Sequence, residues 1–257
     1  MSNYGEELNN YKTHCDFTNQ IIVDVGANIG DITHFFINES QNTSNIYCIE
    51  PELTNYNTLI SRFRLHNNIT IIQAAISTYD GFCNIGIEKQ QKTNGLVQGH
   101  ILDGKLLDLQ SRNWNQKKMK ILCKQLHSIC PNATIIKMDI EGYEHKVIPN
   151  CIHKMNSVHT WLIEIHSTPS IDNHGWDILY DKNNKPINYI FDRSKDSLKL
   201  MLNVFYNNGF QKFIIAKHKT KINDIDNNST WDNIPLYSYR SENETKFYKV
   251  VNLIIKK

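Results

Sequence analysis

The sequence has little net charge, no long apolar run and no closely paired cysteines, and each absence excludes something. Its 257 residues include 28 basic and 26 acidic side chains, a formal charge of +2. Charge therefore gives no argument for binding to nucleic acid or to a membrane surface. No stretch approaches the ~20 apolar residues that a membrane-spanning helix needs. The first seven residues lack a basic region and an apolar core, so we expect no secretory signal.

The six cysteines are scattered, and none belongs to a C-x-x-C pair. This pattern favours neither a disulfide framework nor a zinc site, and it is typical of thiols that stay reduced. We therefore expect a cytoplasmic protein. The length suits one α/β domain with insertions, so we expect residues 1–257 to form a single domain.

The most informative segment is residues 21–30, which read Ile-Ile-Val-Asp-Val-Gly-Ala-Asn-Ile-Gly. An apolar run ends in a glycine-bounded turn, and a helical pattern begins at Asp31. This predicts a buried strand, a tight loop and a helix start, the geometry that binds nucleotide-like ligands. Asn28 replaces the middle glycine of a dinucleotide fingerprint, and no phosphate-binding Lys-Ser or Lys-Thr follows. The pattern suits a ligand with a sugar and a cationic tail but no phosphates, such as S-adenosylmethionine.

A second acidic position follows one strand later. Residues 46–50 read as a short buried strand that ends in Glu50, 20 residues beyond Gly30, and Pro51 stops the strand. A carboxylate at the tip of the second strand holds a ribose diol in doubly wound sheets. The alternative is a solvated loop carboxylate, and the preceding motif makes the ribose contact the better interpretation.

Two further strands end in acids, at 135–144 and at 161–166, and with them the chain resembles the FkbM-type methyltransferase family. The resemblance covers roughly residues 21–166. The matching pieces are Asp24-Val-Gly-Ala-Asn-Ile-Gly30, Glu50-Pro51, Asn67, Ala74-Ala75 with Asp80-Gly81, Lys137-x-Asp-x-Glu-Gly142 with Glu144, and Glu164-x-His166.

Alternating apolar runs and helical patterns indicate a parallel sheet wrapped by helices. With the resemblance, this predicts an α/β fold with a doubly wound, mostly parallel seven-stranded sheet of the class I methyltransferase, Rossmann-like type. We expect strands at 21–25, 46–50, 70–76, 134–139 and 159–165, an exposed strand at 82–87, and an antiparallel edge pair at 210–217 and 247–256. Residues 88–116 and 167–194 lack a regular pattern, and we expect these loops to form the acceptor pocket.

The resemblance implies a cofactor site at the carboxyl ends of the strands. We expect Asp24 to contact the methionine end of S-adenosylmethionine, directly or through water, although a purely structural carboxylate fits equally well. Thr33 is a candidate for bonding the cofactor carboxylate or for simple packing, and Ala75 and Ile76 should flank the adenine while packing in the core. The predicted cofactor residues are Asp24, Gly26, Ala27, Asn28, Gly30, Thr33, Glu50, Pro51, Ala75 and Ile76.

Methyl transfer to an alcohol requires alignment of the acceptor and removal of its proton. Asp139 and His166 stand at the tips of two strands that should be neighbours, and Glu164 shares a strand face with His166. We expect His166 to be the base, because its ordinary pKa is near neutrality, roughly 6.5. A Mg or Mn site built from Asp139, Glu141, Glu164 and His166 is the minority interpretation, and we expect no metal.

These residues favour an S-adenosylmethionine-dependent O-methyltransferase that acts on a hydroxyl of a sugar, a glycan or a related small molecule. Methylation of RNA or protein is an alternative, but it predicts a basic groove that the balanced charge does not favour. A cofactor-binding partner subunit without turnover is the other alternative. We expect a small-molecule or glycan acceptor, no nucleic acid and no membrane partner, and the oligomeric state is left open.

Overall fold

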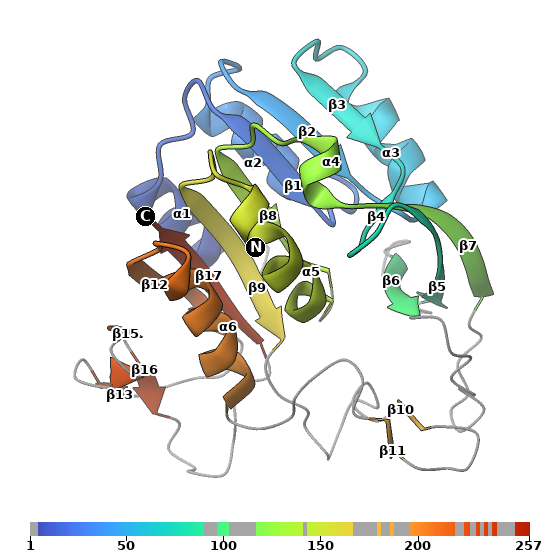
Figure 1. The fold of residues 1–257 in the computed structure, drawn as a ribbon. Helices are drawn as coiled ribbons and strands as arrows, with labels where there is room; N and C mark the ends of the chain where they lie inside the picture. The colour runs from blue at the N-terminus through green and yellow to red at the C-terminus, as the bar shows by residue number, and fades with distance from the viewer. Residues whose placement is uncertain are drawn as a thin grey trace.

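The computed structural model describes most of the chain between residues 5 and 257. The described ranges are 5–89, 97–102, 117–140, 143–166, 179–180, 186–187, 196–218, 224–226, 230–231, 234–235, 238–240 and 250–257. A seven-stranded sheet crosses the molecule and carries helices on both faces (Figure 1). Its strands lie in the order β12 (Lys212–His218), β17 (Val250–Lys256), β9 (Thr160–His166), β8 (Ile135–Met138), β1 (Ile21–Val25), β2 (Asn45–Ile49) and β3 (Ile69–Ile72).

The pairing pattern of this sheet confirms the predicted fold class. The neighbours among β9, β8, β1, β2 and β3 pair in parallel, whereas β17 runs antiparallel to both β9 and β12. The two C-terminal strands were expected as an antiparallel pair at one edge, and this is confirmed, with β12 outermost. The carboxyl ends of β1, β2, β8 and β9 therefore meet at one edge of the sheet.

Two apolar cores lie on opposite faces of the sheet, because successive strand residues point to opposite sides. Ile22 of β1 packs with helices α1 (Gly5–His14), α2 (Asp31–Glu39) and α3 (Leu53–Phe63). Its neighbour Val23 packs on the other face with α4 (Leu126–Ile129), α5 (Glu144–Cys151), the 3-10 turn η2 (Ile152–Lys154) and α6 (Asp196–Asn207). The polar side chains described below share the face of Ile22.

A second sheet of four strands has the order β4 (Ala75–Ile76), β7 (Lys117–Lys124), β5 (Gly81–Lys89) and β6 (Val97–Leu102). It corrects two expectations. The single strand expected at 70–76 is divided between the two sheets, and part of the expected loop at 88–116 is strand. In β6, Gln98-Gly99-His100 separate Val97 from Ile101 and Leu102, and the strand forms by antiparallel pairing with β5.

Three small antiparallel pairs complete the described elements. They are β10 (Leu179–Tyr180) with β11 (Pro186–Ile187), β13 (Asp224–Asp226) with β16 (Ser238–Arg240), and β14 (Thr230–Trp231) with β15 (Ile234–Pro235). The first pair falls inside the stretch 167–194 that was expected to be irregular. The rest of that stretch lies outside the described residues.

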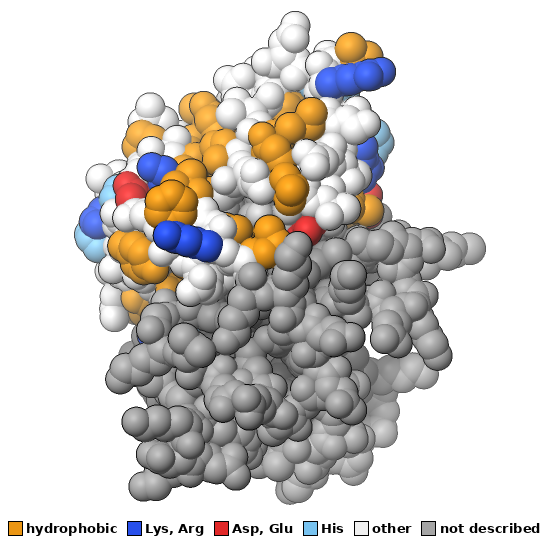
Figure 2. Space-filling view, turned by 90° about the vertical axis from the view of Figure 1, so that its right-hand side faces the viewer, with side chains coloured by type: hydrophobic (Ala, Val, Ile, Leu, Met, Phe, Trp, Pro, Cys, Tyr) orange, Lys and Arg blue, Asp and Glu red, His pale blue; other side chains and the backbone are white. Residues whose placement is uncertain are grey.

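The described surface in Figure 2 carries single basic side chains between apolar and uncharged ones. Phe82 and Leu122 are paired across β5 and β7 and are both exposed, and the Lys120 ammonium lies 4.9 Å from the centroid of the Phe82 ring. Within the described ranges, no helix is long and apolar enough to cross a bilayer. All six cysteines are free thiols, as expected.

Candidate active site

The loop between β1 and α2 needs glycine at both of its ends. Gly26 and Gly30 have φ values of 77° and 90°, in the left-handed region that other residues avoid. A Cβ atom on Gly26 would lie 2.0 Å from the carbonyl oxygen of Asp139, and one on Gly30 would lie 2.4 Å from the Phe63 ring. The glycines therefore let the loop pack against the end of β8 and against α3. Their predicted approach to the cofactor stays a prediction.

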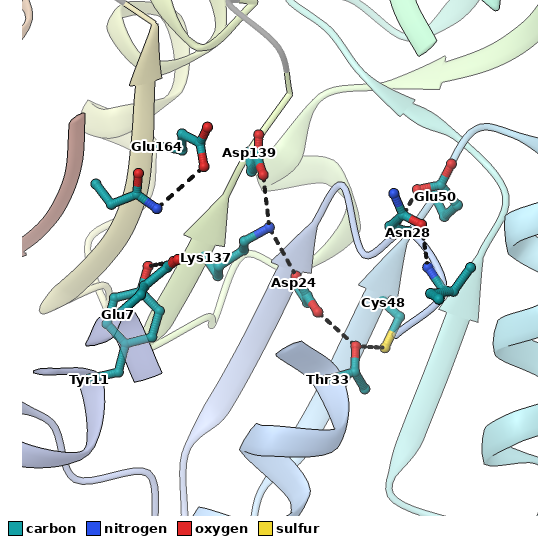
Figure 3. A network of polar contacts seen from close by, with 12 residues as sticks. Glu7, Tyr11, Asp24, Asn28, Thr33, Cys48, Glu50, Lys137, Asp139 and Glu164 are labelled. Carbon is teal, nitrogen blue, oxygen red and sulfur yellow. Dashed lines mark hydrogen bonds and ion pairs between the residues drawn. The ribbon is translucent and has the colours of Figure 1, made fainter. Parts of the chain in front are cut away.

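The backbone amides of this loop turn toward the end of β2. Gly26 and Ala27 donate to the carbonyl oxygen of Ile49, and the Asn28 amide donates to Glu50 Oε2 at 2.9 Å. The other carboxylate oxygen of Glu50 accepts from the Glu52 amide, also at 2.9 Å. The glycine loop and the acid that follows β2 are thus one hydrogen-bonded unit, as Figure 3 shows for Asn28 and Glu50.

Glu50 is only 5% exposed, so the alternative of a solvated loop carboxylate is wrong. Burial raises the pKa of Glu50 to about 7, although the amides of Glu52 and Asn28 counteract this by stabilising the ionised form. Pro51 follows the strand as expected. Glu52 then accepts from the Asn55 amide at 2.8 Å and caps α3, which explains why the helix begins directly after this pair.

Asp24, Lys137 and Asp139 form a row of charges at the carboxyl ends of β1 and β8 (Figure 3). Lys137 lies opposite Asp24 in the strand register, and its ammonium is 3.9 Å from Asp24 Oδ1 and 3.7 Å from Asp139 Oδ2. Asp24 is fully buried, and Asp24 Oδ2 accepts a hydrogen bond from the Thr33 hydroxyl at 2.7 Å. Burial raises the pKa of Asp24, which Lys137 and Thr33 partly offset.

The cofactor contacts predicted for Thr33, Ala75 and Ile76 gain no support from where these side chains lie. The hydroxyl of Thr33 donates a hydrogen bond to Asp24 and also lies 3.3 Å from Cys48 Sγ, inside the core. Ala75 and Ile76 are buried in β4 and pair with β7 of the second sheet. Packing and internal hydrogen bonding account for what the structure shows of these three residues, and their cofactor contacts stay predictions.

The predicted catalytic strands are neighbours. Lys137 of β8 lies opposite Leu162 of β9, so the next residues of both strands lead to the same edge of the sheet. Asp139 is partly exposed there, and Glu164 Oε2 accepts from the Asn252 side chain of β17 at 3.3 Å. His166 ends β9, but its side chain lies outside the described part of the chain. Its approach to Asp139 therefore stays a prediction.

The minority interpretation of a metal site built from Asp139, Glu141, Glu164 and His166 is not tested either, because Glu141 and the His166 side chain are not described. In the part of the chain that the structure does describe, no group of three His, Cys, Asp or Glu side chains has the arrangement of a metal site.

Sequence reasoning gave Lys137 no role and overlooked helix α1. Glu7 and Tyr11 of that helix are buried beside Lys137, and the Tyr11 hydroxyl donates to Glu7 Oε1 at 2.5 Å. A charged residue at an inward position of an otherwise apolar strand was the available signal for Lys137. For Glu7 the sequence holds no such signal, because its burial depends on where α1 docks.

The fold is that of the class I methyltransferases, in which the ligand site lies beyond the carboxyl ends of parallel strands. The sequence matches the methyltransferase FkbM domain over residues 24–212, and the chain belongs to this family. It is an S-adenosylmethionine-dependent methyltransferase, as the resemblance implied.

Solved structures with similar folds have low sequence identity to the chain. Precorrin-6y C5,15-methyltransferase from Geobacter metallireducens is 9% identical, with 98% of this chain and 86% of that chain covered and a TM-score of 0.44. Aeropyrum pernix fibrillarin with bound S-adenosyl-L-methionine is 10% identical, with coverages of 98% and 73% and a TM-score of 0.46. A SAM-dependent O-methyltransferase from Thermotoga maritima is 9% identical, with coverages of 100% and 66% and a TM-score of 0.48. No curated protein matches the chain.

The residues present fit the charge of the cofactor. S-Adenosylmethionine supplies a methyl group on a positively charged sulfur, and the edge of the sheet is rich in carboxylates. Asp24 Oδ1 is buried and accepts no hydrogen bond from any described residue. The Lys137 ammonium lies 3.9 Å from Asp24 and 3.7 Å from Asp139, and the charges of Glu7 and Glu164 also raise its pKa. Such an excess of negative charge favours a cationic ligand.

Proposed function

We propose that the protein transfers the methyl group to a hydroxyl of a sugar, a glycan or a related small molecule. The observation that carries the proposal is the partly exposed carboxylate of Asp139 at the end of β8, held 3.7 Å from the Lys137 ammonium. An alcohol must lose its proton as the methyl group arrives, and this edge offers acidic groups that can orient and stabilise a base.

In this proposal His166 takes the proton, because it ends the strand beside β8. Asp139 orients the imidazole and stabilises its protonated form. Glu164, anchored by Asn252, lies on the same strand face as His166. Asp24 and Glu50 hold the cofactor from β1 and β2. Binding, orientation and proton removal are thus divided among different side chains of this edge.

Several features support a small acceptor in the cytoplasm. The chain has 28 basic and 26 acidic side chains, a balance that gives no argument for a nucleic-acid acceptor. The six free cysteines suit a reducing compartment. The acceptor pocket is proposed to involve residues 88–116 and 167–194.

The test is a transfer assay with isotopically labelled S-adenosylmethionine and a panel of acceptors. The panel holds free sugars, nucleotide sugars, oligosaccharides, polyketide-like alcohols, RNA and protein. Mass spectrometry and NMR then identify the methylated atom, with Asp139→Asn as the impaired variant and the surface variant Glu39→Gln as its control. Methylation of a sugar or small-molecule oxygen is the expected result. Transfer to RNA or protein only, or cofactor binding without transfer to any acceptor, would overturn the proposal.

A further inference from the structure

Helix α1 precedes the region that matches the family, yet it is anchored to the seven-stranded sheet. Asn10 Nδ2 donates to the carbonyl oxygen of Ala216 in β12 at 2.7 Å, and Lys256 of β17 donates to the carbonyl oxygen of His14 at 2.8 Å. Tyr11 belongs to the apolar core on this face. These contacts hold α1 against strands β12 and β17, and β17 is the neighbour of β9.

The inward side of α1 carries a carboxylate where packing alone would favour an apolar residue. Glu7 is 3% exposed, and its described hydrogen bond comes from Tyr11, one turn further along the helix. Burial, followed by the charges of Glu7, Glu164 and Asp139, raises the pKa of Tyr11, so this hydroxyl stays a proton donor. Burying a carboxylate costs free energy unless an opposite charge compensates it.

Lys137 is the cation whose charge acts on Glu7, while its ammonium lies 3.9 Å from Asp24 and 3.7 Å from Asp139. Burial by itself lowers the pKa of Lys137, but the carboxylates of Asp139, Asp24, Glu7 and Glu164 outweigh burial and raise the pKa above its ordinary value. The ammonium is therefore permanently charged. Figure 3 shows Glu7 and Tyr11 beside the Lys137 side chain, on the side of Glu164, while the ammonium points between Asp24 and Asp139.

We propose that Glu7 of α1 and Lys137 of β8 are opposing positioning residues that set the electric field at the carboxyl edge of the sheet, and so determine the preference of the site for the cationic methyl donor over its neutral product. The inference rests on the proposed cofactor site but not on the identity of the acceptor. Glu7 adds negative charge that favours a sulfonium, and Lys137 limits that effect while holding Asp24 and Asp139 in place.

The two ligands themselves provide the measurement. S-Adenosylmethionine and S-adenosylhomocysteine differ only in the methyl group and its positive charge. The ratio of their affinities therefore reports the electric field at the sulfur. A partly misfolded sample affects both titrations alike, so most of its effect drops out of the ratio. Isothermal titration calorimetry of both ligands should be done on the wild type and on the variants Glu7→Gln, Lys137→Met, Lys137→Arg and Glu39→Gln. Glu39 pairs with Lys12 at the surface, so Glu39→Gln removes one carboxylate at a distance from Glu7 and Lys137.

We expect Glu7→Gln to lower the donor-to-product affinity ratio and Lys137→Met to raise it, each by about 3- to 15-fold for a charge acting over roughly 10 Å. Lys137→Arg and Glu39→Gln should keep the wild-type ratio. Equal ratios in wild type and Glu7→Gln, or shifts of Glu7→Gln and Lys137→Met in the same direction, would overturn the proposal. If Lys137→Met does not fold, the proposal is still tested by comparing the donor-to-product affinity ratio of Glu7→Gln with that of Glu39→Gln. Failure to find a sugar acceptor would leave these ratios unaffected, because neither measurement needs an acceptor.

Discussion

Replacing Glu50 by Gln should change the stability of the protein in a way that depends on pH. The carboxyl group is 5% exposed, and burial raises its pKa from an ordinary 4.5 to about 7. The folded protein therefore binds one more proton than the unfolded chain between about pH 4.5 and 7. The linkage relation then requires the free energy of unfolding to fall as the pH rises through this interval, and to level off above pH 7.

The magnitude follows from the interval between the two pKa values. At about 1.4 kcal/mol for each tenfold change in an equilibrium constant, a rise from 4.5 to about 7 corresponds to about 3–4 kcal/mol. Glutamine cannot ionise, so Glu50→Gln escapes this loss. It keeps only one acceptor oxygen for the amides of Asn28 and Glu52, which costs about 1–3 kcal/mol at every pH. The difference between pH 5 and pH 8 is therefore the quantity to measure.

The assay is denaturant unfolding at pH 5, 6, 7 and 8, followed by tryptophan fluorescence, without cofactor. Between pH 5 and pH 8, the free energy of unfolding of the wild type should fall by about 2–3 kcal/mol more than that of Glu50→Gln. Glu39→Gln controls for the general loss of one negative charge. Parallel pH curves for wild type and Glu50→Gln would refute the reasoning, because they would mean that the folded protein does not raise the pKa of this carboxyl group.

Three further predictions concern ligands and catalysis. S-Adenosylhomocysteine should bind with a micromolar Kd, on the order of −8 kcal/mol, and more tightly as the pH rises toward 7, because a ribose diol donates to the ionised form of Glu50. Glu50→Ala should weaken binding by about 1–3 kcal/mol. Tight binding of NAD without a response to S-adenosylhomocysteine in calorimetry would contradict this. Methyl transfer should continue in excess EDTA; a complete loss that Mg or Mn restores would instead place Asp139, Glu164 and His166 in a metal shell. His166→Ala should bind cofactor almost normally but turn over roughly 100- to 10,000-fold more slowly, with a wild-type rate that rises through the His166 pKa and then levels off. Near wild-type turnover of His166→Ala on the true acceptor would remove the base from the mechanism.

The strand, loop and helix around Gly26 and Gly30 follow from the sequence because their causes are local. Four apolar residues of the five in Ile21–Val25 must be buried, and three residues of the turn, Gly26, Asn28 and Gly30, are left-handed. The same holds for Glu50, which the sequence places at the tip of β2. The parallel, neighbouring placement of the two strands that lead to Asp139 and His166 was also expected from the sequence, and it is confirmed.

The sequence does not reveal how strands compete for partners. The expected strand at 70–76 is divided because Ile69–Ile72 pairs with β2 while Ala75–Ile76 pairs with β7. Residues 97–102 were expected to be loop because Gln98-Gly99-His100 break their apolar pattern, and they form β6 by pairing with β5. Such pairing depends on residues far away in the chain, so local propensity cannot predict it.

The electrostatics of the site are likewise a product of the tertiary structure. The motif residues Asp24, Glu50 and Asp139 can be read from the sequence, but their burial and their partners cannot. Strand register places Lys137 opposite Asp24, and the docking of α1 brings Glu7 and Tyr11 to the same place. A pKa depends on exclusion of water and on charges within a few ångströms, and both are set only when distant segments pack together. The sequence thus determines which acids end the strands, whereas the packed structure determines which of them face one buried ammonium.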